Sequence, residues 1–169
     1  MGLCDAFTGA QRAEGPDPLQ ILSPATGRVV RMADIPDPVF SEGMMGVSVG
    51  IWPDDDEVRC PVDGTVTAAM PHAYGISTPG GVEIIVHVGV DTVEMRGEGF
   101  DVRVAKGRRV LAGQTLVRVD RGKVAQAGYP DVVILAVSNT DELVSSGRAV
   151  RDVAPAHVTA GDVLMEVTS

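Results

Sequence analysis

The chain has 169 residues, the length of a single domain, and 44% of them are hydrophobic, which is enough to build a buried core. Its formal net charge of −9 argues against binding to nucleic acid or anionic membrane surfaces and favours a basic partner. Cys4 and Cys60 are too few for a disulfide framework, so we expect a reduced, cytoplasmic compartment.

Residues 1–18 are predicted to be a flexible N-terminal tail, because they contain several glycines and prolines and few large apolar side chains. They lack the basic and apolar regions of a signal peptide, and no later apolar run has the length of a membrane span. Residues 19–169 are predicted to form one domain. The 20 glycines and 11 prolines of the chain predict many short strands with little helix, hence an all-β fold.

Two pairs of short motifs repeat along this domain. The pattern P-x-x-G-x-V occurs at 24–29 and 61–66, and V-x-A-G-x-x-L occurs at 110–116 and 158–164. Turns reuse glycine and proline, so each echo alone is open to explanation by similar hairpin chemistry. Two separate pairs favour a duplication, and they predict an antiparallel β-sandwich with duplicated hairpin halves.

The segment 34–50 interrupts the strand pattern. Pro36 and Pro38 exclude a regular strand here, and the segment carries several apolar side chains that are expected to cap the core. Four shorter segments follow with simpler expectations. They are a solvated turn at 54–57, a basic hairpin tip at 106–110, a buried strand at 132–137 and a single helical turn at 140–145.

The stretch 82–88, V-E-I-I-V-H-V, is the strongest functional signal. Its β-branched residues predict a strand, in which Glu83, Ile85 and His87 share one face. Gly80 and Gly81 supply a turn before it, and His72 lies at a distance suited to a hairpin partner. Two imidazoles brought together are suited to nucleophilic phosphoryl chemistry or to a metal; the alternative is two ordinary strand histidines. Glu83 is expected to be an exposed carboxylate.

The run 72–100, H-A-Y…G-V-E-I-I-V-H-V-G-V-D-T-V-E-M-x-G-E-G-F, resembles the signature of the glucose-type enzyme IIA family of the bacterial phosphoenolpyruvate-dependent sugar phosphotransferase system. The resemblance extends over 19–169 through I-P-D-P-V-F-S-E-G-M-M-G, C-P-V-D-G-T-V and V-S-N-T-D-E-L. It implies the duplicated hybrid motif, with His87 as phospho-acceptor and His72 as supporting histidine. It also implies a cytoplasmic phosphocarrier that accepts a phosphoryl group from phospho-HPr and passes it to enzyme IIB during sugar uptake.

The same resemblance implies a partner-binding surface around the histidines. Phe40, Met44 and Met45 would rim an apolar depression, while Asp37 and Asp91 would hold an arginine of HPr. The alternative for Asp91 is a cap on the turn before Thr92. Regulated metabolic or transport proteins are further possible partners, and contact with the membrane is expected only through the sugar permease.

The sequence departs from the resembled family at one place near the histidines. Many members have a threonine two residues before the first histidine, hydrogen-bonded to it, whereas this chain has Met70. His72 must then be oriented by another group, for which a backbone carbonyl is the expected candidate. No cofactor is required, but His72 and His87 are candidate ligands for zinc at a partner interface, where a partner carboxylate would complete the incomplete site.

Three alternative functions match parts of the sequence. A zinc-dependent hydrolase of lysostaphin-like architecture fits His87-x-x-x-Asp91, but the H-x-H pair of those peptidases is missing, and His157 is expected at the surface. A lipoyl- or biotin-type carrier needs a hairpin lysine in a recognisable setting, which neither Lys106 nor Lys123 has. A purely regulatory binding module remains compatible with a phosphocarrier.

Overall fold

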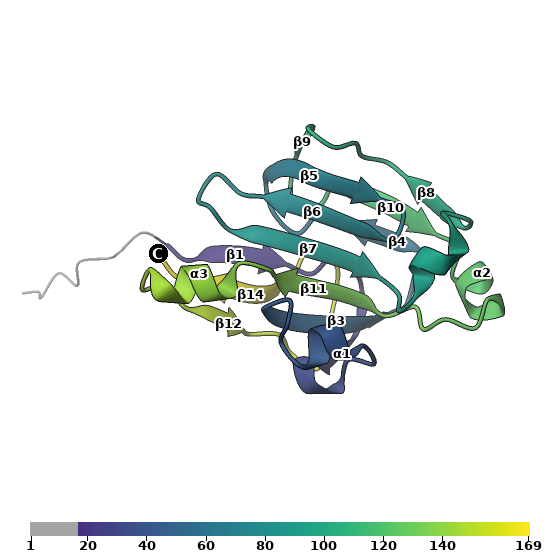
Figure 1. Cartoon of the computed structure of the whole chain (residues 1–169), viewed down its shortest axis with the longest axis horizontal. Helices are drawn as coiled ribbons and strands as arrows, with labels where there is room; N and C mark the ends of the chain where they lie inside the picture. The colour runs from purple at the N-terminus through teal and green to yellow at the C-terminus, as the bar shows by residue number, and fades with distance from the viewer. Residues whose placement is uncertain (1–16) are drawn as a thin grey trace, which may run out of the picture.

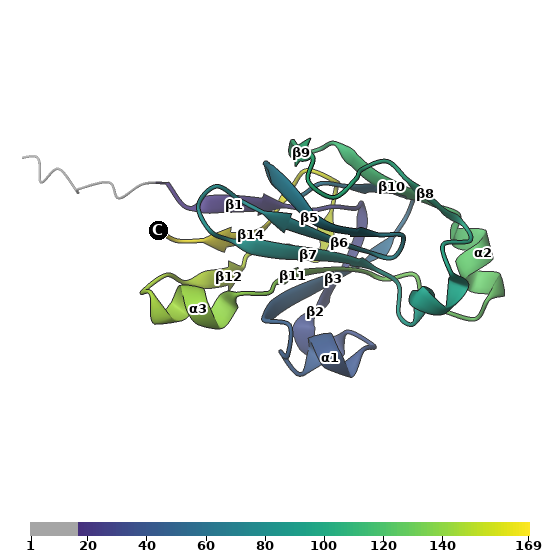
Figure 2. The same ribbon diagram turned by 45° about the horizontal axis from the view of Figure 1, so that its top comes forward.

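Antiparallel strands dominate the computed structural model, which describes residues 17–169 (Figure 1). Eight strands form one large sheet in the order β13-β2-β3-β11-β7-β6-β5-β9, and two small sheets have the orders β1-β14-β12 and β4-β10-β8. Figure 2 shows these layers from a second direction. The predicted all-β sandwich with little helix is therefore confirmed.

Within residues 17–169 the strands group into three sheets, and five short helical segments connect them. The large sheet contains β13 (His157–Val158), β2 (Gly27–Arg31), β3 (Val47–Pro53), β11 (Val133–Val137), β7 (Glu83–Val88), β6 (Ala73–Ser77), β5 (Gly64–Met70) and β9 (Arg109–Val110). The small sheets contain β1 (Leu19–Leu22), β14 (Val163–Val167) and β12 (Val150–Asp152), and β4 (Glu57–Arg59), β10 (Thr115–Val119) and β8 (Phe100–Val102). The helical segments are η1 (Met32–Asp34), α1 (Pro38–Ser41), η2 (Thr92–Met95), α2 (Arg121–Gln126) and α3 (Thr140–Ser145).

The strand order is symmetric about the central pair β11-β7, which confirms the duplication. Gly27 of the first proline–glycine motif pairs with Val158, and Gly64 of the second pairs with Val110. Each small sheet likewise has the strand of one valine–glycine motif, β10 or β14, at its centre. One half is the continuous segment β4 to β10, and it is inserted between the two parts of the other half, β1 to β3 and β11 to β14.

The main core lies between the large sheet and the two small ones. Its side chains are mostly valine, isoleucine and leucine, as expected for a chain with few aromatics, and every residue of β11 is buried. β11 is buried on both faces because its other face packs in a second cluster with Val30, Ile35 and Phe40. The predicted buried strand at 132–137 is confirmed, and so is the helical turn at 140–145, which is α3.

The outer face of the large sheet is covered unequally, and this asymmetry creates the site. The connection from β2 to β3 contains η1 and α1, and it covers the first half of that face (Figure 1). Asp37 caps α1 by accepting a hydrogen bond from the Val39 amide, and Pro38 follows at its first position. The equivalent connection from β5 to β6 is only Pro71 and His72, so it leaves the second half open.

One expectation, for the turn at 54–57, needs correction, and another, for the tail at 1–18, concerns residues that lie mostly outside 17–169. The solvated turn at 54–57 is wrong for Glu57, which begins β4 and accepts hydrogen bonds from Thr115 and Arg59. The Thr115 hydroxyl is the main cause of a lowered pKa for this carboxylate. The predicted tail at 1–18 lies outside the described residues, except for Asp17 and Pro18. Within 17–169, no helix is long and apolar enough to cross a membrane.

Candidate functional site

His87 lies near the end of β7 and faces the open half of the outer sheet surface. Burial alternates along the strand as predicted, with Ile84, Val86 and Val88 buried and the intervening residues half-buried. Its neighbour across the sheet is Ala73 of β6. The residue before Ala73 is His72, so the hairpin turn places the second histidine beside the first.

The two imidazoles meet edge to face. Their ring centroids are 5.5 Å apart, with an interplanar angle of 79°. The Val88 amide donates a hydrogen bond of 2.7 Å to the His72 carbonyl oxygen, which ties the turn to the strand of His87. The prediction that a hairpin brings the two histidines together is therefore confirmed.

The His87 ring is held in one tautomer by its own strand end. Its Nδ1 lies 2.8 Å from the Gly89 carbonyl oxygen, which can only accept, so Nδ1 carries the proton and Nε2 keeps a free lone pair. Gly89 has φ +77°, and a Cβ there would lie 2.3 Å from Thr92 Cγ2. Only glycine fits this position, which explains why the carbonyl can turn back toward the ring.

An apolar depression of about 370 Å³ surrounds the histidines. The Phe40 ring packs against His87, with centroids 5.3 Å apart and planes tilted by 57°. The lining offers few groups that could orient a water molecule, which suits a bound phosphoryl group that must not be hydrolysed. The lining residues are Asp37, Val39, Phe40, Met45, Ala68, Met70, His72, Ala73, Tyr74, Gly75, Ile85 and His87.

The surroundings keep both histidines neutral. Burial lowers the pKa of His72, and burial is also the main cause of the lowered pKa of His87, to which the neighbouring His72 adds. The Gly89 carbonyl and the carboxylates of Asp37 and Asp91 oppose this shift without reversing it. A neutral imidazole is the nucleophilic form, so His87 is ready to react at neutral pH.

We expect the pKa of both imidazoles to lie below 6.5, so that each ring is less than half protonated at the pH where an unperturbed histidine is half protonated. A lowered pKa means that the proton binds only in more acidic solution, so the midpoint of the titration should lie below that pH. Heteronuclear NMR of the two rings between about pH 5 and pH 8 measures this directly. A midpoint at or above pH 6.5 for His87 would contradict the electrostatic account.

The predicted partner-binding residues divide into two groups. Asp37, Phe40 and Met45 line the depression, whereas Met44 is 69% exposed and lies outside the lining. Asp91 is exposed, in the left-handed region at φ 59°, and its side chain accepts no capping hydrogen bond, so the cap expected as its alternative is wrong. Its charge acts on His87 instead.

Two lining residues on β5, Ala68 and Met70, were not identified as site residues from the sequence. They lie two and four positions after Val66, which is buried in the core, so strict alternation would bury them too. The pairing of β5 with β6 is irregular between Val66 and Ala68, and this bulge turns the later residues to the outer face. No local sequence signal identifies the bulge.

The structure also shows the surroundings of His72, Glu83 and His157, for each of which the sequence supports a simple expectation. The His72 ring has no hydrogen-bond partner within 17–169, so the expected orienting carbonyl is wrong, and the ring contacts His87 instead. Glu83 is half-buried rather than exposed, because it accepts a hydrogen bond of 2.7 Å from Ser77. His157 is exposed and pairs with Asp54 at 3.1 Å, as expected for a surface residue.

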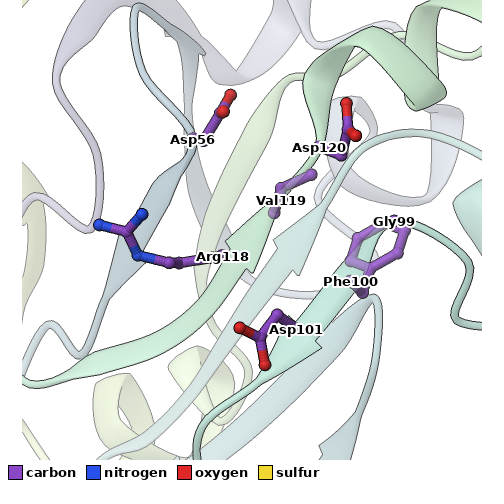
Figure 3. Close-up of a pocket in the computed structure, with 7 residues that line it drawn as sticks. All are labelled: Asp56, Gly99, Phe100, Asp101, Arg118, Val119 and Asp120. Atoms are coloured by element: carbon purple, nitrogen blue, oxygen red, sulfur yellow. The ribbon is translucent and has the colours of Figure 1, made fainter.

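A second hollow lies between β4, β8 and β10, but it has none of this chemistry (Figure 3). In Figure 3 the Asp101 carboxylate points away from those of Asp56 and Asp120. Asp101 is paired with Arg103 at 2.6 Å, and Asp120 caps α2 by accepting from the Lys123 amide. Both carboxylates are therefore already used in interactions that stabilise the fold, and they do not point toward a common ligand position.

The described part of the chain contains no group of three or more histidine, cysteine, aspartate or glutamate side chains that could hold a metal ion. His72 and His87 therefore supply two ligands without a third, whereas a catalytic zinc typically has three protein ligands. The hydrolase alternative is not supported.

Comparisons with known proteins found a family model, curated relatives and a solved structure that resemble this chain. A family described as "phosphoenolpyruvate-dependent sugar phosphotransferase system, EIIA 1" matches residues 19–143. A glucose-specific EIIA component from Halalkalibacterium halodurans is 40% identical over 133 residues, which are 78% of this chain and 77% of that protein. A glucose-specific EIICBA component from Staphylococcus saprophyticus is 35% identical over 151 residues, 88% of this chain and 22% of that protein. The solved glucose permease IIA from Mycoplasma capricolum has a TM-score of 0.78 and 34% identity, covering 89% of this chain and 96% of that one.

Proposed function

The chain belongs to the EIIA family of the phosphoenolpyruvate-dependent sugar phosphotransferase system, and on this premise we propose that His87 is the residue that carries the phosphoryl group. Phosphoryl carriage within that system is the function of the family. The observation that supports His87 most directly is its tautomer. A proton fixed on Nδ1 by the Gly89 carbonyl leaves Nε2 as a free nucleophile in an apolar depression.

In the proposed step, the Nε2 lone pair of His87 attacks the phosphorus of phospho-HPr. The new N–P bond forms as the bond from phosphorus to the donor breaks, and the electron pair of that bond stays with the donor. The phosphorylated ring becomes cationic because Nδ1 keeps its proton, and the Gly89 carbonyl, 2.8 Å from Nδ1, stabilises that charge. Onward transfer to enzyme IIB is the same displacement with this chain as donor.

His72 is the proposed supporting histidine. Its ring stands edge-on to His87 at 5.5 Å between centroids, close enough for one ring nitrogen to donate a hydrogen bond to an oxygen of the transferred group. Burial keeps this ring neutral, so it has one N–H to donate. Its contribution is largest where negative charge must be held in place during onward transfer.

The partner surface is the rim of the depression. Val39 and Met70 are 41% and 48% exposed at its edge, and flexible methionine suits a surface that contacts more than one partner. Asp37 and Asp91 lie close enough to influence His87, so an arginine of HPr bound to them would also approach the phosphoryl group. Met44 belongs to this proposed surface as an exposed apolar residue beyond the depression. Regulated metabolic or transport proteins are proposed to use the same rim.

The enzyme IIB partner and a cytoplasmic location are part of the same proposal. The Staphylococcus saprophyticus relative is named an EIICBA component, a name that combines the letters C, B and A. This chain corresponds to the A component. It would deliver its phosphoryl group to a B component, whether that component is a separate protein or is linked to it. The net charge of −9 supports basic protein partners and makes nucleic acid an unsuitable one.

The direct test is labelling of the wild-type chain with phosphoenolpyruvate, the first enzyme of the system and HPr. We expect one acid-labile phosphoryl group per chain, formed only when HPr is present, and its loss when an enzyme IIB domain is added. Absence of HPr-dependent labelling would reject the carrier mechanism for this chain. Labelling without discharge to any enzyme IIB would reject the proposed second step.

We further propose that zinc can bind this site only with help from a partner. His72 and His87 provide two imidazoles, and within 17–169 no third ligand accompanies them. A carboxylate from a bound partner would complete the coordination. Phosphate on His87 would block its Nε2, so binding of this kind belongs to the unphosphorylated form.

Calorimetry of the isolated chain with zinc should therefore show weak binding without a sharp stoichiometric end point, as expected for a site with two protein ligands in place of three or four. A His72→Gln variant, which leaves one ligand, is the matched control and should bind more weakly still. Tight, stoichiometric binding by the isolated chain would contradict the proposal.

A further inference from the structure

The hairpin turn that carries His72 does not have the usual backbone. Met70 pairs with Ala73, so Pro71 and His72 form a two-residue loop. Such loops normally use turns with positive φ at one or both positions, because this matches the twist of the strands. Neither Pro71 nor His72 is among the described residues with positive φ. The position of this loop therefore depends on contacts from outside it.

Two hydrogen bonds from outside the loop hold its backbone, and a glycine lies close to the proline ring. The Val88 amide donates to the His72 carbonyl at 2.7 Å. The Tyr74 hydroxyl donates to the Pro71 carbonyl at 2.9 Å. Gly97 lies so close to the proline that a Cβ there would be 3.2 Å from Pro71 Cγ. Because the His72 ring itself has no hydrogen bond within 17–169, its direction depends on the position of its backbone, which these contacts fix, and on its contact with the His87 ring.

Tyr74 is suited to hold the loop because it bridges the core and the turn. It lies on β6 with none of its surface exposed, between Ala69 and Val86 on the neighbouring strands. Phenylalanine would fill the same space, so packing alone does not require a hydroxyl. The hydroxyl has the Pro71 carbonyl as its partner, and burial raises the pKa of this phenol well above its already alkaline ordinary value. It therefore remains a donor at any pH used for transfer assays.

We propose that Tyr74 is a positioning residue for phosphoryl transfer, whose hydroxyl holds the Pro71 carbonyl and so directs the His72 imidazole toward His87. This inference rests on the proposed supporting function of His72. Tyr74 does not touch the reacting atoms; it acts through the turn. It provides the restraint on His72 that Met70, which has no hydrogen-bonding side chain, cannot provide.

The test is a double-mutant cycle with Tyr74→Phe and His72→Gln. We expect Tyr74→Phe to be phosphorylated by phospho-HPr to the wild-type extent but to pass the group to enzyme IIB about tenfold more slowly, as a modest misplacement near the chemistry would do. In the His72→Gln background, Tyr74→Phe should change the transfer rate no further, because its effect runs through His72. Tyr129→Phe is the matched control, since the Tyr129 hydroxyl has no partner within 17–169, and it should transfer at the wild-type rate.

NMR of the histidine rings separates positioning from a general structural effect. In Tyr74→Phe the His72 resonances should shift and broaden, while the His87 nitrogen shifts should still report a proton on Nδ1, because the Gly89 carbonyl still holds it. Equal slowing in both backgrounds, an unchanged transfer rate or an unmoved His72 ring would each overturn the proposal. Normal onward transfer by His72→Gln alone would instead reject the proposed function of His72, and the NMR spectra would still decide whether Tyr74 orients the ring.

Discussion

Replacing His87 with alanine is expected to abolish phosphorylation by phospho-HPr, with a loss of more than about 10³-fold, the scale found when a catalytic nucleophile is removed. The substitution removes the imidazole whose tautomer is fixed by a hydrogen bond to the Gly89 carbonyl. The neighbouring His72 ring has no such hydrogen bond within 17–169. The measurement is incorporation of phosphate from labelled phosphoenolpyruvate through HPr. The fold should persist, because the His87 side chain is only half-buried on the outer face.

His157→Ala is the matched control for this experiment. His157 is exposed, it pairs with Asp54 on the surface, and it belongs to β13 at the edge of the large sheet. We expect this variant to be labelled at the wild-type rate and to the wild-type extent. Normal labelling of His87→Ala would exclude His87 as the acceptor, and an equal loss of labelling in His157→Ala would show that the loss is not specific to His87.

Replacing His72 with glutamine is expected to separate acceptance from onward transfer. Acceptance depends on the free Nε2 lone pair of His87, which the substitution leaves in place, so His87 should still accept the phosphoryl group at a rate within a few-fold of wild type. Transfer to enzyme IIB should fall by about 10²-fold, the usual scale for loss of one positioned catalytic group. Rapid-quench measurement of discharge from the phosphorylated variant to an enzyme IIB domain gives this rate.

The opposite pattern would reverse the roles of the two histidines. If His72→Gln failed to accept phosphate yet discharged normally once labelled by other means, His72 would be needed for the first step. Circular dichroism and the melting temperature serve as controls here, because the His72 carbonyl, not its ring, accepts the hydrogen bond from Val88. The backbone contact is retained in the variant, so stability should change little.

The strand that carries His87 could be predicted in detail because its signal is local. Alternation of β-branched residues sets two faces, and the burial along β7 follows it residue by residue. The duplication was visible for the same reason, since equivalent turns reuse the same glycine and proline positions. In the structure these motifs pair with each other at Gly27 and Val158 and at Gly64 and Val110.

The lining of the depression could be predicted only in part. Phe40 and Met45 face the histidines as expected, whereas Met44, next in sequence to Met45, lies outside the lining. A short helix and its loop expose neighbouring residues in different directions, and no periodic pattern over so few residues identifies which one faces inward. On β5, the bulge after Val66 reversed the faces of Ala68 and Met70.

By itself the sequence determined the β class, the internal repeat, the face on which His87 lies and its proximity to His72, because turn chemistry and strand alternation act over a few neighbouring residues. Only the tertiary structure decided the tautomer of His87, the apolar enclosure and the anchoring of the His72 turn by Tyr74. These features depend on the register of strands that are distant in sequence. They also depend on the long β2–β3 connection, which contains α1 and covers one half of the sheet, and on the two-residue β5–β6 connection, which leaves the other half open. Such differences arise from packing between segments, which no local pattern encodes.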